Sequence, residues 1–295
     1  MRTLLLAACL AAGAAVLPAP AAGQRGDAAQ PPELRFGEQP LATGVRLHYA
    51  VQGPAEGEPV VLLHGLTDSW FSFSRVLPLL PERHRYFALD LRVHGDSDRP
   101  PADYGMRHMA LDVLAFMNAQ GIERFAVVGH SMGSLVAQQL AALAPERVTR
   151  LVLMASGANG DGLAPFDTMV QALTDPVPEA FIREFQLSTV YVPLPDAFLA
   201  RVIEESSKVP ARVWRGVMTD IMAFQVPPRL ARVTVPTLIM WGDRDVTFPR
   251  AQQDALRARI PQARFLEYPE VGHALHWERP EPVAADLAAF LDAGR

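Results

Sequence analysis

The sequence predicts an α/β fold, with a mostly parallel, doubly wound sheet of about eight strands and a helical cap inserted between two of them. Short apolar runs such as Val60–Leu63 and Thr237–Trp241 alternate with longer segments of helical spacing. Continuous apolar runs of this length are typical of strands buried on both faces. The alternation stops over residues 157–232 and then resumes. A chain of 295 residues, 49% of them hydrophobic, suits one large domain with such an insertion.

The first 23 residues have the pattern of a secretory signal peptide. Arg2 supplies a positive charge, residues 3–17 are apolar, and small residues follow at cleavage-site spacing. We therefore expect an exported protein, periplasmic or secreted, in which residues 24–32 form a flexible tether. Two alternatives stay open, an uncleaved membrane anchor and lipidation at Cys9. Because Cys9 is the only cysteine, the cleaved protein would contain no disulfide.

The core is expected to consist of residues 33–156 and 233–295. Its first two strands mix apolar and polar residues, which favours an antiparallel pair at the sheet edge. Segments with apolar residues three and four positions apart are predicted to be helices, and Gly121 ends the second of them. We expect strands at 34–36, 45–51, 60–63, 86–89, 125–128, 148–154, 237–241 and 263–268, and core helices at 72–80, 106–120, 131–143, 250–260 and 282–291.

Residues 157–232 are expected to form the helical cap. Eight prolines divide this segment into short pieces of helical spacing. Sites in α/β proteins form outside the carboxyl ends of the strands, so an insertion between two strands would lie over the active site. We expect cap helices near 166–173, 179–187, 196–207 and 211–224.

A nucleophile is indicated by the segment Gly129-His130-Ser131-Met132-Gly133, which reads G-x-S-x-G. An apolar strand precedes it and a helical segment follows, as in the sharp turns that expose a nucleophilic serine. Glycine at 129 and 133 would remove side chains that crowd such a turn. The alternative is a glycine-rich turn with a structural serine.

A serine nucleophile needs a base and an acid that orients it, and in this class of turn the chain order is serine, acid, histidine. The order here is Ser131, then Asp243 or Asp245, then His273. We favour Asp245 because it lies further into its loop, beyond Gly242. The rival base is His276, which we expect to be a packing residue or part of the pocket wall.

The oxyanion hole needs two N–H groups aimed at the developing negative charge. We expect one from Met132, directly after the nucleophile, and the other from Leu66, in the loop that follows the third strand. Gly65 would let the backbone approach closely, and His64 would hold the loop by hydrogen bonds. The other histidines, among them His130 behind the turn, are expected to be structural or exposed.

Five motifs carry a family resemblance: His64-Gly65, Asp90-Leu91-Arg92-x-His94-Gly95-x-Ser97, Gly129-His130-Ser131-Met132-Gly133, Trp241-Gly242-x-x-Asp245 and Gly272-His273. Over residues 34–292 the chain resembles the α/β-hydrolase fold superfamily. It is similar to the helical-capped branch that holds esterases, lactonases, non-haem haloperoxidases and C–C hydrolases. Val93 departs from the pattern, because relatives often carry glycine there. Relatives that open epoxides or remove halides use aspartate as nucleophile, so Ser131 argues against both reactions.

The expected activity is hydrolysis of carboxylic esters of small or medium apolar substrates through an acyl-enzyme. The alternative on the same triad is hydrolysis of a lactone or of a C–C bond in a diketone. A catalytically silent binding protein is the alternative from another class. An apolar substrate is favoured by apolar residues after the oxyanion loop and in the cap, although such residues are more often core. They are Trp70, Phe71, Phe73, Phe166, Met169, Phe181 and Phe185.

We expect a small-molecule ester as the partner and no cofactor. No H-E-x-x-H or clustered His/Cys spacing suggests a metal site. A sequence pI near 5.9 and the lack of a Lys/Arg block give no reason to expect nucleic-acid binding. Stable membrane insertion is not expected once the signal is removed.

Overall fold

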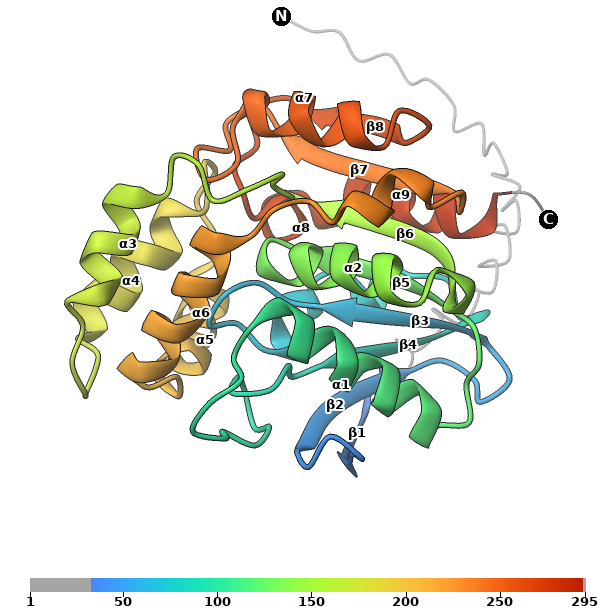
Figure 1. The fold of residues 1–295 in the computed structure, drawn as a ribbon, viewed down its shortest axis with the longest axis horizontal. Helices are drawn as coiled ribbons and strands as arrows, with labels where there is room; N and C mark the ends of the chain where they lie inside the picture. Colours follow the sequence, from blue (N-terminus) through green and yellow to red (C-terminus); the bar gives the residue numbers. More distant parts are fainter. Residues whose placement is uncertain (1–32, 294–295) are drawn as a thin grey trace, which may run out of the picture. The chain divides into compact units, whose positions relative to one another are not determined.

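One eight-stranded sheet organises the chain, with its strands in the order β1-β2-β4-β3-β5-β6-β7-β8 (Figure 1). The computed structural model describes residues 33–293, so the expected signal peptide, tether and Cys9 lie outside the described residues. Neighbouring strands are parallel, except that β2 is antiparallel to both β1 and β4. The predicted fold class is confirmed. The strands are β1 (Arg35–Pro40), β2 (Arg46–Gln52), β3 (Glu58–Leu63), β4 (His84–Leu89), β5 (Phe125–His130), β6 (Val148–Met154), β7 (Thr237–Gly242) and β8 (Arg264–Tyr268).

Two hydrophobic cores lie on opposite faces of the sheet, because successive residues of a strand point to opposite sides. Val61 and Leu63 of β3 pack with side chains of α1, α2 and α7, whereas Val60 and Leu62 pack with η1, η2 and α9. Figure 1 shows α1 and α2 side by side on one face. None of the helices in this described part is long and apolar enough to cross a membrane. The core helices are α1 (Met106–Ala119), α2 (Met132–Leu143), α7 (Arg250–Arg259), α8 (Leu275–Glu278) and α9 (Pro280–Asp292).

The expected helix at 72–80 is wrong. The structure has two short 3₁₀ turns instead, η1 (Trp70–Phe73) and η2 (Leu77–Leu79). The side chain of Ser69 starts the first by accepting the Phe71 N–H at 3.2 Å. Pro78 has no N–H to donate and restricts the preceding residue, so a continuous α-helix cannot pass through it. A third short turn, η3 (Pro145–Arg147), leads into β6.

Four helices and a short turn lie between β6 and β7. Pro178, Pro195 and Pro210 directly precede α4, α5 and α6, so each proline separates one helix from the next. Trp214 is fully buried among these helices, and its ring centroid lies 5.1 Å from that of Phe185. The cap helices are α3 (Ala164–Gln171), α4 (Glu179–Ser188), α5 (Asp196–Ser207) and α6 (Ala211–Ala223), followed by η4 (Pro228–Arg232).

Polar contacts join these helices to the core. The carboxylate of Asp220 in α6 accepts the Met106 N–H at 2.7 Å, which caps the start of α1. At the end of α5, the Lys208 ammonium lies 3.0 Å from the carboxylate of Asp96. Both contacts therefore join the two longest cap helices, α5 and α6, to the segment that runs from the end of β4 to the first residue of α1.

Candidate active site

Ser131 stands at the turn between β5 and α2 in strained backbone, with φ +51° and ψ −121°. A non-glycine residue adopts positive φ only at a cost, and such strain is concentrated at functional sites. A Cβ on Gly129 would collide with the carbonyl oxygen of Gly133, and a Cβ on Gly133 with that of Leu63. Positions 129 and 133, two residues on either side of the serine, must therefore be glycine for strand and helix to meet this closely. The turn leaves Ser131 at the N-terminus of α2, facing a pocket.

His273 and Asp245 form a buried hydrogen-bonded pair. The Nδ1 atom of His273 lies 2.9 Å from Oδ2 of Asp245. The other carboxylate oxygen accepts the N–H groups of Thr247 at 2.8 Å and Phe248 at 3.0 Å. His273 lines the same pocket as Ser131. The three predicted residues, which come from the ends of β5, β7 and β8, are brought to one place.

The rival residues lie elsewhere. Asp243 accepts the Glu270 N–H at 2.7 Å, which links the loop after β7 to the loop after β8, and it makes no bond to His273. His276 is fully buried, and its Nε2 lies 3.0 Å from the Ser72 hydroxyl. Burial lowers the pKa of His276 to about 3. It is thus a neutral packing residue rather than a base.

The loop after β3 is held by His64. Its Nδ1 lies 2.8 Å from the Gly65 carbonyl, and its Nε2 accepts the Leu91 N–H at 3.0 Å. This pairing requires the proton on Nδ1, and burial lowers the pKa of His64 well below its usual value. Leu66 and Met132 both line the pocket. Within residues 33–293, the backbone N–H of neither residue finds a hydrogen-bond acceptor.

The pocket is mostly apolar, with walls from both core and cap. Phe166 and Phe185 line it, whereas Met169 does not and is 51% exposed. Phe181 packs on Trp214 instead of lining the pocket. Residues that the sequence analysis had not placed there also line the wall, namely Leu135, Leu163, Met218, Ile221, Phe248 and Trp277.

Among the polar residues of the pocket that were not predicted to face it are His130 and Asp68. His130, expected behind the turn, lines the pocket, and its Nε2 lies 3.1 Å from the His273 carbonyl. Asp68 follows Leu66 by two residues and is only 5% exposed. Burial raises the pKa of the Asp68 carboxyl to about 7, and the nearby His273 opposes this shift. An acid after the oxyanion loop was visible in the sequence, but its burial depends on the cap.

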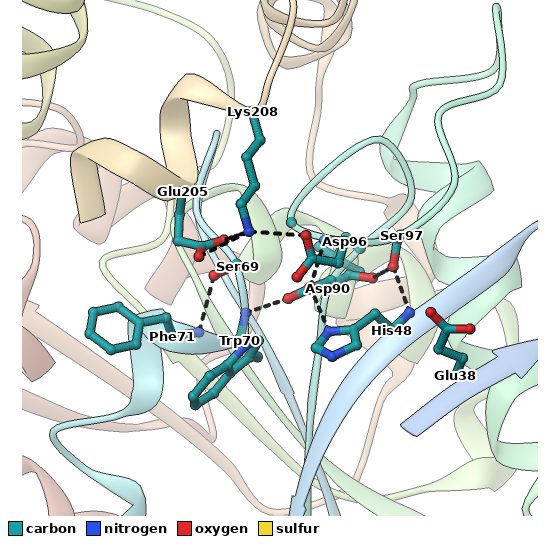
Figure 2. Close-up of polar contacts among 12 residues, drawn as sticks. Glu38, His48, Ser69, Trp70, Phe71, Asp90, Asp96, Ser97, Glu205 and Lys208 are labelled. Carbon is teal, nitrogen blue, oxygen red and sulfur yellow. Dashed lines mark hydrogen bonds and ion pairs between the residues drawn. The ribbon is translucent and has the colours of Figure 1, made fainter. Parts of the chain in front are cut away.

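A second polar cluster, drawn in Figure 2, lies beside the loop after β4 and holds residue types that can bind a metal. Ligand atoms of His48, Asp90 and Asp96 lie within 4.8 Å of one another. However, Asp90 already accepts the Trp70 N–H at 2.7 Å, the Asp96 N–H at 2.9 Å and a bond from His48 at 2.8 Å. The Lys208 ammonium further neutralises Asp96. The side chains of this cluster are thus engaged in hydrogen bonds and an ion pair that fix the loop after β4.

Solved structures share this fold. A putative aryl esterase from Burkholderia cenocepacia matches with a TM-score of 0.78, covering 87% of this chain and 98% of that one at 22% identity. At this identity the match shows the fold alone.

Sequence comparison shows the family. Residues 60–286 match the alpha/beta hydrolase family. The chain is 32% identical to the "Putative carbamate hydrolase RutD" of Caulobacter vibrioides, covering 83% of this chain and 95% of that one. It is 31% identical to the "Putative non-heme chloroperoxidase" of Synechocystis sp., covering 88% and 99%. The chain belongs to the alpha/beta hydrolase family and is a hydrolase.

Proposed function

We propose that this hydrolase cleaves carboxylic esters of small or medium apolar substrates through an acyl-enzyme on Ser131. One observation carries the proposal: Ser131 and the His273–Asp245 pair open onto a single apolar pocket with two unpaired N–H groups. A serine, a base with its orienting acid and two donors are the parts that acyl transfer requires.

The reaction follows from this arrangement. The Nδ1–H of His273 donates a hydrogen bond to the Asp245 carboxylate, which leaves Nε2 to take the Ser131 proton as Oγ attacks the substrate carbonyl. The Leu66 and Met132 N–H groups stabilise the oxyanion of the tetrahedral intermediate. Collapse breaks the ester bond, and His273 passes its proton to the departing alkoxide. Water then attacks the acyl-enzyme with His273 again as base, and the acid is released.

The substrate class is inferred from the pocket wall. Phe166 and Phe185 from the cap and Leu135 from α2 offer apolar surface to an acyl or alcohol chain. Burial of apolar substrate surface contributes about 25 cal/mol per Å². The cap would supply this selectivity, while the residues of the core supply the chemistry.

The test combines labelling and turnover. A fluorophosphonate probe should modify the wild-type enzyme at Ser131 and leave Ser131→Ala unmodified. A panel of p-nitrophenyl esters of increasing chain length should be hydrolysed, and the panel should include a lactone, a vinylogous diketone and a carbamate. No labelling, or turnover confined to the lactone, the diketone or the carbamate, would overturn the proposal.

We also propose that the protein is exported after cleavage of residues 1–23. The support is the charged, apolar and small-residue order of this segment, as in a secretory signal.

A further inference from the structure

Asp68 is poorly paired for a buried carboxylate. Its oxygens accept from the Ser72 hydroxyl and from the Gln186 amide, each at 3.3 Å, and from the backbone N–H of Gly65. That distance is at the long end for a hydrogen bond, and a carboxylate has room for about four donors. Within residues 33–293 no Lys or Arg forms an ion pair with it.

Other buried aspartates of this chain are better paired. Asp112 lies against the Arg92 guanidinium at 2.7 Å and accepts the Thr43 hydroxyl at 2.6 Å. Asp90 and Asp245 each make three hydrogen bonds of 2.7–3.0 Å. Burial of a charged group without such partners is costly, so an exception calls for an explanation.

A second unpaired acceptor lies beside Asp68. The Nε2 of His130 bonds to the His273 carbonyl, so Nε2 carries the proton and Nδ1 has only a lone pair to offer. That Nδ1 atom is buried and has no partner. A Cβ placed on Gly65 would lie 3.0 Å from Oδ2 of Asp68 and 3.2 Å from this Nδ1. Above pH 7, where Asp68 is ionised, two acceptors without adequate donors therefore lie next to the oxyanion loop. Both residues line the pocket that holds Ser131.

We propose that Asp68, assisted by His130, binds a hydrogen-bond donor of the substrate, so that the enzyme prefers esters carrying an O–H or N–H group near the scissile bond. The inference rests on the proposed ester hydrolysis. Unpaired acceptors in an apolar pocket favour a ligand that supplies the missing donor. A site built to bond a substrate hydroxyl also rejects the analogue that lacks it.

The competing role for Asp68 is a structural clamp. Gln186 of α4 donates to Asp68 and also to the Ser206 hydroxyl at 2.7 Å, and Thr67 donates to Ser206 at 3.2 Å. This network joins the oxyanion loop to two cap helices. Ser206 belongs to the network but does not line the pocket. Ser206→Ala is therefore a matched control that weakens the clamp and leaves the pocket acceptors in place.

The experiment uses two ester pairs, and in each pair one member carries a hydroxyl where the other has a hydrogen atom or a methyl group. The first pair is p-nitrophenyl butyrate and p-nitrophenyl 3-hydroxybutyrate, which test the acyl side. The second is propyl butyrate and 2-hydroxyethyl butyrate, which test the alcohol side. Each kcat/KM for Asp68→Asn is divided by the wild-type value on the same ester, so intrinsic ester reactivity cancels. In at least one pair, the hydroxylated ester should lose about tenfold more than its partner, whereas Ser206→Ala should affect both members equally.

Equal losses for both members of both pairs in Asp68→Asn would make Asp68 a clamp and overturn the inference, while the proposed ester hydrolysis would stand. Wild-type enzyme that cleaves none of the four esters would overturn the proposed function and the inference with it. Asp68→Ser, compared in the same way, replaces Asp68→Asn if the latter does not fold.

Discussion

The imidazole of His273 and the carboxylate of Asp245 meet at 2.9 Å, and two backbone N–H groups grip the other oxygen of that carboxylate. The acid is thus fixed by its own loop, independently of its contact with the histidine. With Nδ1 engaged, Nε2 is the ring nitrogen left for proton transfer at Ser131.

Ser131→Ala and His273→Ala should each lower kcat on p-nitrophenyl esters by about 10⁴–10⁶, because nucleophile and base act as a unit. Thermal unfolding should change little for Ser131→Ala, whereas His273→Ala should unfold at a lower temperature, because it removes a buried side chain and the hydrogen-bond partner of Asp245. The double variant should be no slower than either single variant. Activity near that of the wild type in either single variant would disprove the triad.

Asp245→Asn should cost far more activity than Asp243→Asn. An asparagine at 245 can hold His273 in the wrong tautomer, and it carries no charge to stabilise the imidazolium. Asp243 serves as the control, since its carboxylate accepts the Glu270 N–H and makes no bond to His273. Comparison of kcat for the two variants decides the assignment, and a larger loss at Asp243 would reverse it.

Phe166→Ala and Phe185→Ala should shift the preference for acyl-chain length, because both rings line the pocket. Met169→Ala is the matched control, since this side chain is largely exposed on the same cap. The ester panel and the melting temperature should be measured on all three variants. If the phenylalanine variants kept the wild-type ranking of substrates and only melted earlier, the rings would be packing residues of the cap.

The free energy of unfolding of Asp68→Asn, relative to that of the wild type, should increase as the pH rises from 5 to 8. Burial raises the pKa of Asp68 to about 7 in the folded protein, against 3.8 for an unperturbed aspartate. Between these values the folded state binds a proton that the unfolded state has lost, so wild-type stability falls with rising pH. Burial lowers the pKa of both His130 and His276, the buried histidines nearby. The difference in unfolding free energy between variant and wild type should grow by roughly 1–3 kcal/mol over these pH values, whereas a constant difference would contradict a raised pKa.

The exported protein should begin near Ala22 or Gln24. Amino-terminal sequencing of periplasmic or secreted material tests this directly. A chain that retains Met1 would instead indicate an anchor or a protein that stays inside the cell.

Local patterns in the sequence predicted what depends on local physics. Continuous apolar runs indicated the central strands, and G-x-S-x-G indicated the turn at Ser131. The structure then brought Asp245 and His273 together, as the order of the loops suggested. The helix expected at 72–80 failed because Pro78 interrupts it. Asp68 was missed because its partner Gln186 lies 118 residues away, and no local pattern reports which acids the cap will bury.

The contact between Lys208 and Asp96 has a practical consequence, because Lys208 is the only lysine in the 295 residues. Amine-reactive dyes and surface couplings will therefore attach at the amino terminus and at this one side chain, at the boundary between cap and core (Figure 2). Acylation removes the charge that Asp96 and Glu205 share. A fluorophore on Lys208 would report cap movement and loosen the cap as it does so. Immobilisation of this enzyme is better directed to an engineered cysteine on a distant surface.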